Sequence, residues 1–87
     1  MFLHVGAGLT VKTSEVIGIF DLDNTSQSIV TRKYLSAAEK AGAVVNAAGL
    51  ELPKSFVVCS RDGKQTVYLS QLNSSTLLKR SDSLGLE

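Results

Sequence analysis

Short apolar runs separated by turn residues predict β-strands near the start of the chain. Phe2–Val5 and Leu9–Lys12 flank Gly6-Ala7-Gly8, whose glycines permit the backbone angles of a tight turn. Thr13-Ser14-Glu15 then leads into Val16–Leu22, an almost continuous apolar stretch. Apolar residues at successive positions are typical of a strand covered on both sides, so we expect this strand to be buried on both faces.

A helical period follows these strands. Apolar residues recur at helical spacing and predict one long amphipathic helix: Val30, Tyr34, Ala37, Ala38 and Ala41. Its small alanines would let it lie close to a sheet or to a neighbouring helix. The side-chain oxygens of Asp23-Asn24-Thr25-Ser26 are suited to an N-cap, and Gly42 is suited to end the helix. The charged residues fall mostly off the stripe and predict a solvated face: Arg32, Lys33, Glu39 and Lys40.

A β-hairpin is the clearest prediction in the second half of the chain. Ala43–Asn46 predicts a short strand, and Pro53 keeps the following loop, 47–52, extended. Two β runs, Ser55–Ser60 and Gln65–Ser70, are then separated by Arg61-Asp62-Gly63-Lys64. Asp-Gly is favoured in two-residue hairpin turns, so these runs should pair as neighbours.

The chain closes with a second, short helix. Asn73–Arg80 has serines at its start, and Ser74 or Ser75 is the expected N-cap. Residues 81–87 are expected to fray. The order of elements predicts the α+β class, with antiparallel strands and a hairpin, one long amphipathic helix and a short C-terminal helix in a single domain over residues 1–80.

Composition indicates a cytoplasmic protein that self-associates. The 87 residues are 44% hydrophobic, and with no tryptophan this weight falls on Val, Leu, Ile and Ala. So short a chain has a modest core, and part of its apolar surface should contact another subunit. Neither a signal peptide nor a membrane span is indicated. The single cysteine, Cys59, fits a buried strand position in a reducing compartment.

The residues that could carry chemistry do not assemble into a catalytic or metal site. Gly6-Ala7-Gly8 lacks the lysine and the following helix of a phosphate-binding loop, and His4 is the only histidine, for which a structural role is expected. Asp21 and Asp23, with Asn24, could face a cation, but the glycine and distal glutamate of a calcium loop are missing and helix capping explains them better. We therefore predict a non-enzymatic protein without metal or cofactor.

Charge leaves room for a modest nucleic-acid interface. Nine Lys or Arg against eight Asp or Glu give a net charge of +1, so there is no strong overall basic field. The cations not assigned to the long helix are concentrated around the hairpin and the last helix, where they could together form one patch that contacts phosphates: Lys54, Arg61, Lys64, Lys79 and Arg80. The alternative is an ordinary charged surface with scattered cations.

The order and separation of several segments resemble a known family. After the short first strand these segments are Gly6-Ala7-Gly8, Val16-Ile17-Gly18-Ile19-Phe20-Asp21, Leu52-Pro53-Lys54-Ser55-Phe56-Val57-Val58, Tyr68-Leu69-Ser70 and Ser74-Ser75-Thr76-Leu77-Leu78-Lys79-Arg80. Together they resemble the bacterial extracellular-matrix regulators of the RemA/RemB type, most closely the RemB-like branch. The resemblance covers residues 1–80, and it depends on all the segments rather than on any one of them.

This resemblance implies a small cytoplasmic protein of biofilm-forming Gram-positive bacteria that activates matrix genes by binding DNA, and RemA-type members assemble into rings. In the RemA-type branch, an arginine pair in the loop before the fourth β run is thought to contact DNA phosphates. The corresponding loop is Leu50-Glu51-Leu52-Pro53-Lys54-Ser55, with one glutamate and one lysine in place of the arginines. Lys54 is the positional match, and Lys79 and Arg80 match the family's basic ending.

Two functions remain open from the sequence. The leading hypothesis is a homo-oligomeric regulator of matrix (biofilm) gene transcription, in which repeated Lys54 and hairpin cations contact the DNA backbone without reading bases. The alternative is a protein-interaction module of the same fold that has lost DNA binding and partners a RemA-like paralogue. Glu51 and the near-neutral net charge favour the alternative.

Overall fold

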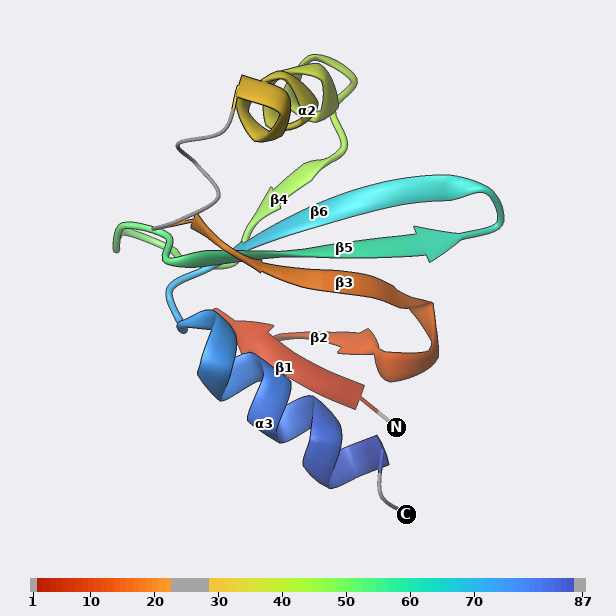
Figure 1. The fold of residues 1–87 in the computed structure, drawn as a ribbon, viewed down its shortest axis with the longest axis vertical. Coiled ribbons are helices and arrows are strands. Elements are labelled where there is room, and N and C mark those ends of the chain that lie inside the picture. The colour runs from red at the N-terminus through yellow and green to blue at the C-terminus, as the bar shows by residue number, and fades with distance from the viewer. Residues whose placement is uncertain (1, 23–28, 86–87) are drawn as a thin grey trace.

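A four-stranded sheet separates two covering layers (Figure 1). The fold is taken from a computed structural model, which describes residues 2–22 and 29–85. Helix α2 lies on one face of the sheet, and a two-stranded hairpin together with helix α3 lies on the other. This arrangement confirms the α+β class in one compact unit.

The strands agree closely with the apolar runs of the sequence. In chain order they are β1 (Phe2–Gly6), β2 (Leu9–Lys12), β3 (Val16–Asp21), β4 (Val44–Asn46), β5 (Ser55–Arg61) and β6 (Lys64–Ser70), with a 3-10 turn η1 (Thr13–Glu15) before β3. The four-stranded sheet has the order β3-β5-β6-β4, and β1 pairs with β2 separately. All pairs are antiparallel except β4–β6, so the sheet is mixed rather than purely antiparallel.

The β5–β6 hairpin confirms the Asp-Gly prediction. Arg61 pairs with Lys64, and only Asp62 and Gly63 lie between them. Both turn residues have left-handed backbone angles, with φ of 53° at Asp62 and 81° at Gly63. This geometry matches a type I′ turn, which follows the natural twist of the two strands and therefore fixes their register.

Strand β3 differs from its prediction because it lies at an edge of the sheet. We expected burial on both faces, but Ile17 is 57% and Phe20 39% exposed. The pairing register shifts between Val16 and Gly18, so Ile17 sits at a β-bulge. The Phe20 ring stacks on Phe56 of β5 at 5.1 Å between centroids but keeps its outer side open. Because β3 pairs with a strand on one side only and a single helix lies on this face, its apolar side chains are only partly covered.

Helix α2 (Ile29–Lys40) contacts the sheet with only part of the predicted stripe. Tyr34, Leu35 and Ala38 pack on the sheet, and none of the helix residues is fully buried. The exposed members of the predicted stripe are Val30, Ala37 and Ala41. The apolar face of the helix is thus wider than the part of it that contacts the sheet. The predicted N-cap, 23–26, lies outside the described residues.

The end of α2 confirms the role predicted for Gly42. Its φ is 71°, and its N–H donates to the Glu39 carbonyl at 3.0 Å. The Ala43 N–H donates to the Ala38 carbonyl at 2.9 Å. These two bonds form a Schellman motif, which satisfies carbonyls that the last turn leaves open and directs the chain into β4.

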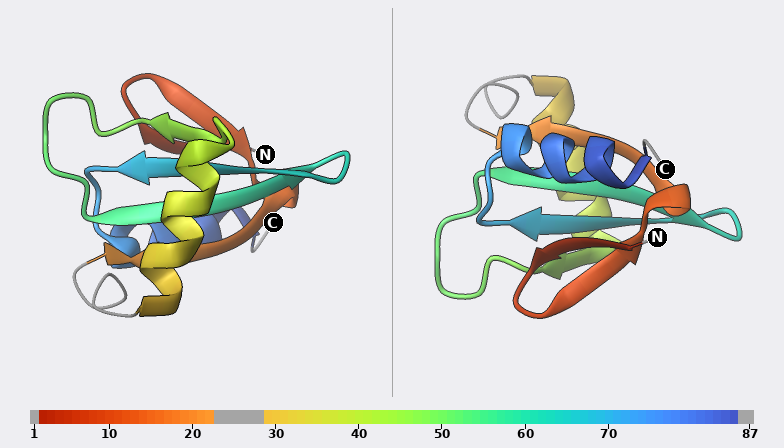
Figure 2. Two further views of the ribbon diagram at one scale, coloured as in Figure 1. Left: turned by 90° about the horizontal axis from the view of Figure 1, so that it is seen from above. Right: turned by 90° about the horizontal axis from the view of Figure 1, so that it is seen from below.

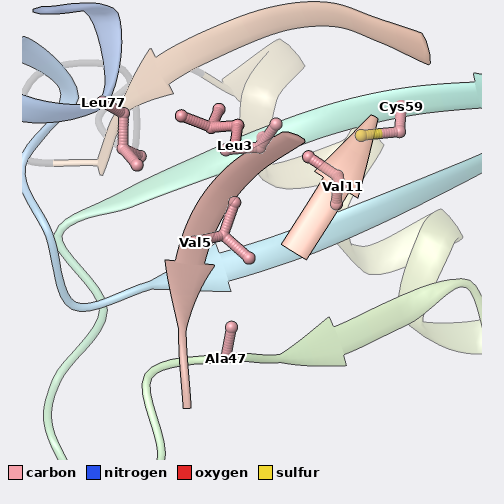
Figure 3. Close-up of a cluster of buried hydrophobic side chains, with 7 residues drawn as sticks. Leu3, Val5, Val11, Ala47, Cys59 and Leu77 are labelled. Carbon is pink, nitrogen blue, oxygen red and sulfur yellow. The ribbon is translucent and has the colours of Figure 1, made fainter. Parts of the chain in front are cut away.

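The face opposite α2 holds the densest part of the core (Figure 3). Leu3 and Val5 of β1 meet Val57 of β5 and Leu77 of α3, all with less than 2% of their surface exposed. Figure 2 shows α3 and the β1–β2 hairpin covering this side together. At the end of β1, Gly6 has φ of 133°, and a Cβ there would overlap the Ala47 carbonyl. Glycine therefore lets β1 approach the chain that follows β4.

Helix α3 (Ser74–Gly85) is 12 residues long, the same length as α2, so the distinction between a long and a short helix does not hold. It extends past Arg80, into the stretch predicted to fray. Its cap is Asn73 rather than Ser74 or Ser75, because the Asn73 Oδ1 accepts from the Thr76 N–H at 2.8 Å. Among the described residues, no helix is long and apolar enough to cross a membrane.

Candidate functional site

The residues considered for catalysis or metal binding lie apart. Within 2–22 and 29–85, no group of three or more His, Cys, Asp or Glu residues could hold a metal. His4 is exposed on β1 rather than held in the core, and Gly6-Ala7-Gly8 forms the β1–β2 turn. Asp21 ends β3, whereas Asp23 and Asn24 lie outside the described residues. Within the described residues, these candidate groups therefore lie on separate elements.

Cys59 occupies the buried strand position that its sequence predicted. It lies on β5 in the core shared with β1, β2 and α3 (Figure 3). Burial, and to a smaller extent the negative charge of Glu15, raises the pKa of the thiol from 9.0 to about 11. The thiol therefore remains protonated at neutral pH, and a protonated, buried thiol is a poor nucleophile.

The candidate phosphate-binding cations are not brought into one patch. Lys54 directly precedes β5, and Arg61 and Lys64 lie at the other end of the β5–β6 hairpin. At about 3.3 Å per residue along β5, these positions are roughly 20 Å apart. Lys79 and Arg80 are exposed on α3, in the layer opposite α2. The described residues thus place these cations at three separate positions in the fold.

Arg61 has an acidic neighbour. Its Nε lies 3.6 Å from the Glu15 Oε2, with 73% of the Arg61 side chain and 25% of the Glu15 side chain exposed. An exposed pair of this kind stabilises the fold little, but it reduces the net positive charge at that end of the sheet. Arg61 is consequently a weaker candidate for phosphate binding than the sequence suggested.

Lys54 is held in a fixed place by its backbone. Its N–H donates to the Ser70 carbonyl at 2.8 Å, and its carbonyl accepts from the Leu22 N–H at 3.0 Å. The hydroxyls of the next residue and of its partner on β6 add further bonds: Ser55 Oγ donates to the Leu72 carbonyl at 2.7 Å, and Ser70 Oγ donates to the Val5 carbonyl at 2.6 Å. The exposed Lys54 side chain is therefore presented from a rigid base.

The loop before Lys54 carries two of the most exposed apolar side chains among the described residues. Leu50 and Leu52 have relative exposures of 107% and 86%, and the exposed Glu51 stands between them. The side chain of Asn46 shapes the start of this loop, since its Nδ2 donates to the Gly49 carbonyl at 3.2 Å and its Oδ1 accepts from the Ala48 N–H at 3.0 Å. We call residues 50–52 the leucine loop.

A groove between β3 and α2 is the main feature that the sequence did not predict. It encloses about 340 Å³ and is lined largely by Ile17, Phe20, Val30, Tyr34, Phe56 and Val58. Its polar edge is closed by the Tyr34 hydroxyl, which donates to the Gln65 Oε1 at 3.1 Å. We call it the α2–β3 groove. In the sequence, the groove was indicated only by apolar residues of the α2 stripe that do not pack on the sheet, such as Val30.

Comparisons with known proteins identify relatives along nearly the whole chain. The family model described as RemA-like, extracellular matrix regulatory protein A-like, matches residues 2–80. Extracellular matrix regulatory protein B of Bacillus subtilis (strain 168) is 36% identical over 81 residues, which cover 93% of this chain and 90% of that protein. Both findings agree with the family resemblance drawn from the sequence.

Proposed function

This chain belongs to the RemA-like family of extracellular matrix regulatory proteins, and we propose that it controls transcription of matrix (biofilm) genes as a non-enzymatic, cytoplasmic homo-oligomer. In this proposal the oligomer is a closed ring, and it binds the DNA backbone through Lys54, repeated once per subunit. The observation that carries the proposal is the rigid presentation of the exposed Lys54 by its backbone hydrogen bonds to β6 and to the end of β3. Arg61, Lys64, Lys79 and Arg80 are the further candidate contacts.

Repetition is essential to this mechanism. One subunit has a net charge of +1 and keeps Lys54 about 20 Å from the hairpin cations, so it can neutralise few phosphates at once. Each neutralised phosphate adds a salt-dependent increment to the affinity for DNA. Copies held side by side would join these increments into one binding event with a high effective concentration.

A fluorescence anisotropy titration with promoter-length duplex tests the proposal. We expect binding at ~50 mM salt that weakens steeply by ~200 mM. Lys54→Glu should weaken binding and reduce the salt slope, whereas Lys12→Glu, a matched change of an exposed lysine on β2, should preserve both. An absence of binding at ~50 mM salt would rule out the DNA-binding part of the proposal.

A second candidate is an interaction module that has lost DNA binding and partners a RemA-like paralogue. It is supported by Glu51 beside the exposed leucines, and by the ion pair that occupies Arg61. Co-purification with such a paralogue, combined with a DNA affinity that does not change in Lys54→Glu, would favour this candidate over the first.

A further inference from the structure

We propose that the leucine loop of one copy docks into the α2–β3 groove of a second copy of this chain. The inference rests on the oligomeric state in the proposed function and assigns that state a specific contact. Two independent surfaces motivate it: a fixed loop with exposed leucines, and a groove with exposed apolar walls. Neither surface is satisfied within one subunit.

The groove side of this contact is an apolar surface without a cover. Ile17 is 57% exposed, Phe20 39% and Val30 76%, and all three line the groove. Ala37 extends the same surface along α2, because residues seven apart share a helix face. Contiguous apolar surface of this kind is typical of protein interfaces.

The loop side is a fixed segment with two exposed leucines. Leu50 and Leu52 project from a segment held by the Asn46 side chain, so little conformational freedom is lost on binding. A groove of about 340 Å³ has room for leucine side chains. Burial of leucine side chains favours association, so repeated contacts can hold an assembly together.

One subunit does not make this contact with itself. Leu50 and Leu52 have relative exposures of 107% and 86%, and neither lines the groove of its own subunit. Helix α2 crosses the strands between the β5–β6 turn and the segment that holds the leucine loop (Figure 2). Because the loop and the groove are different surfaces, we infer a head-to-tail contact, and such contacts build rings when the rotation closes.

Charge also matches the loop to the groove of a second copy. Glu51 stands between the two leucines, and Lys33 shares the helix face of Val30, Tyr34 and Ala37 by its spacing. A loop seated in the groove brings Glu51 to this lysine. The second groove, on the other side of α2, is a poorer partner because its lining includes two charged residues, Arg32 and Glu39.

The mass of single variants in solution tests each side of the contact. In sedimentation experiments at matched concentrations, Leu52→Glu and Val30→Glu should each shift the oligomer to the 9.2 kDa monomer. Leu78→Glu on α3, where the leucine is 47% exposed, is the matched control and should preserve the oligomer. Circular dichroism and a thermal melt establish that each variant is folded. Folded variants that keep the wild-type mass would overturn the proposal.

Mixing the two variants tests the head-to-tail geometry. Leu52→Glu keeps an intact groove and Val30→Glu keeps an intact loop, so one productive contact remains between them. An equimolar mixture should therefore form heterodimers, although each variant alone is a monomer. A mixture that contains only monomers would overturn the head-to-tail contact.

A charge exchange tests the pairing of Glu51 with Lys33. Glu51→Lys and Lys33→Glu should each weaken assembly severalfold, and the double variant should recover most of the loss. Double-variant assembly as weak as the sum of the two single losses would contradict this part of the contact. A wild-type oligomer that resists all these changes would refute the docking proposal alone, whereas an oligomer that assembles as expected but fails to bind DNA would refute only the proposed DNA binding.

Discussion

The two faces of the sheet are covered to very different degrees. On one face, α3 and the β1–β2 hairpin together enclose Leu3, Val5 and Leu77, each with less than 2% of its surface exposed. On the other face, α2 alone covers the sheet, and it contributes no fully buried residue. Exposed apolar side chains remain beside it, with Val30 76% exposed.

The difference comes from the covering elements and not from the strands. Alternate residues of β5 serve both faces, with Val57 and Cys59 on the closed side and Phe56 and Val58 beneath α2. A single helix of 12 residues is too narrow to cover a four-stranded sheet that it crosses (Figure 2). The closed face therefore holds the larger cluster of buried side chains, and the other, open face keeps apolar side chains exposed.

The largest effect on stability is expected when a buried side chain of the closed face is truncated. Leu77→Ala should lower the free energy of unfolding by about 3–4 kcal/mol, because it removes fully buried methyl groups and leaves a cavity. Leu78→Ala, at the next position but 47% exposed, should cost less than about 1 kcal/mol. Urea unfolding with an unchanged m-value measures both. Equal losses at the two positions would contradict the comparison between the faces.

A second effect on the closed face depends on pH. Because the pKa of Cys59 is about 11 in the folded protein and 9.0 is its ordinary value, the unfolded chain releases the thiol proton first as the pH rises. Stability should be fully retained below about pH 9 and should fall between about pH 9 and 11, by roughly 2–3 kcal/mol. Cys59→Ala should remove this part of the pH dependence. If the free energies of unfolding of the wild type and of Cys59→Ala change in parallel from pH 9 to 11, Cys59 is not the source of this pH dependence.

The features that the sequence predicted correctly are set by local chemistry. Asp62-Gly63 defines a two-residue turn whatever surrounds it, and Gly42 ends α2 through bonds within its own last turn. The family was also predicted, since it depends on the order of segments along the whole chain.

The features that were missed depend on which elements become neighbours. The open side of β3 follows from its position at the sheet edge and from the bulge at Ile17, neither of which periodicity reveals. The α2–β3 groove joins residues from separate elements, so no single motif encodes it. Asn73 was passed over as a cap because the serines after it are equally good cap residues, and only the geometry of the chain entering α3 distinguishes them.

A smaller effect should separate the observed cap of α3 from the predicted ones. Asn73→Ala removes the acceptor of the Thr76 N–H and of the Ser75 hydroxyl, both at 2.8 Å, and should cost about 1 kcal/mol. Ser74→Ala is the matched control and should cost less, since serine and alanine differ little inside a helix. Thermal unfolding of the two variants measures the difference. A larger loss of stability in Ser74→Ala would indicate that Ser74, as expected from the sequence, caps the helix.

The smallest effect is expected on the open face, where it sharpens the comparison most. Val30→Ala should change the free energy of unfolding by less than about 0.5 kcal/mol in dilute protein, because the side chain is 76% exposed. The same replacement at Val67, which is 1% exposed beneath α2, should cost several times more. As the protein concentration rises, assembly should stabilise the wild type more than Val30→Ala, since binding to the folded state raises apparent stability. Melting temperatures measured across a hundredfold range of protein concentration test this expectation. If the melting temperature of the wild type does not depend on concentration, the open face stays uncovered in solution.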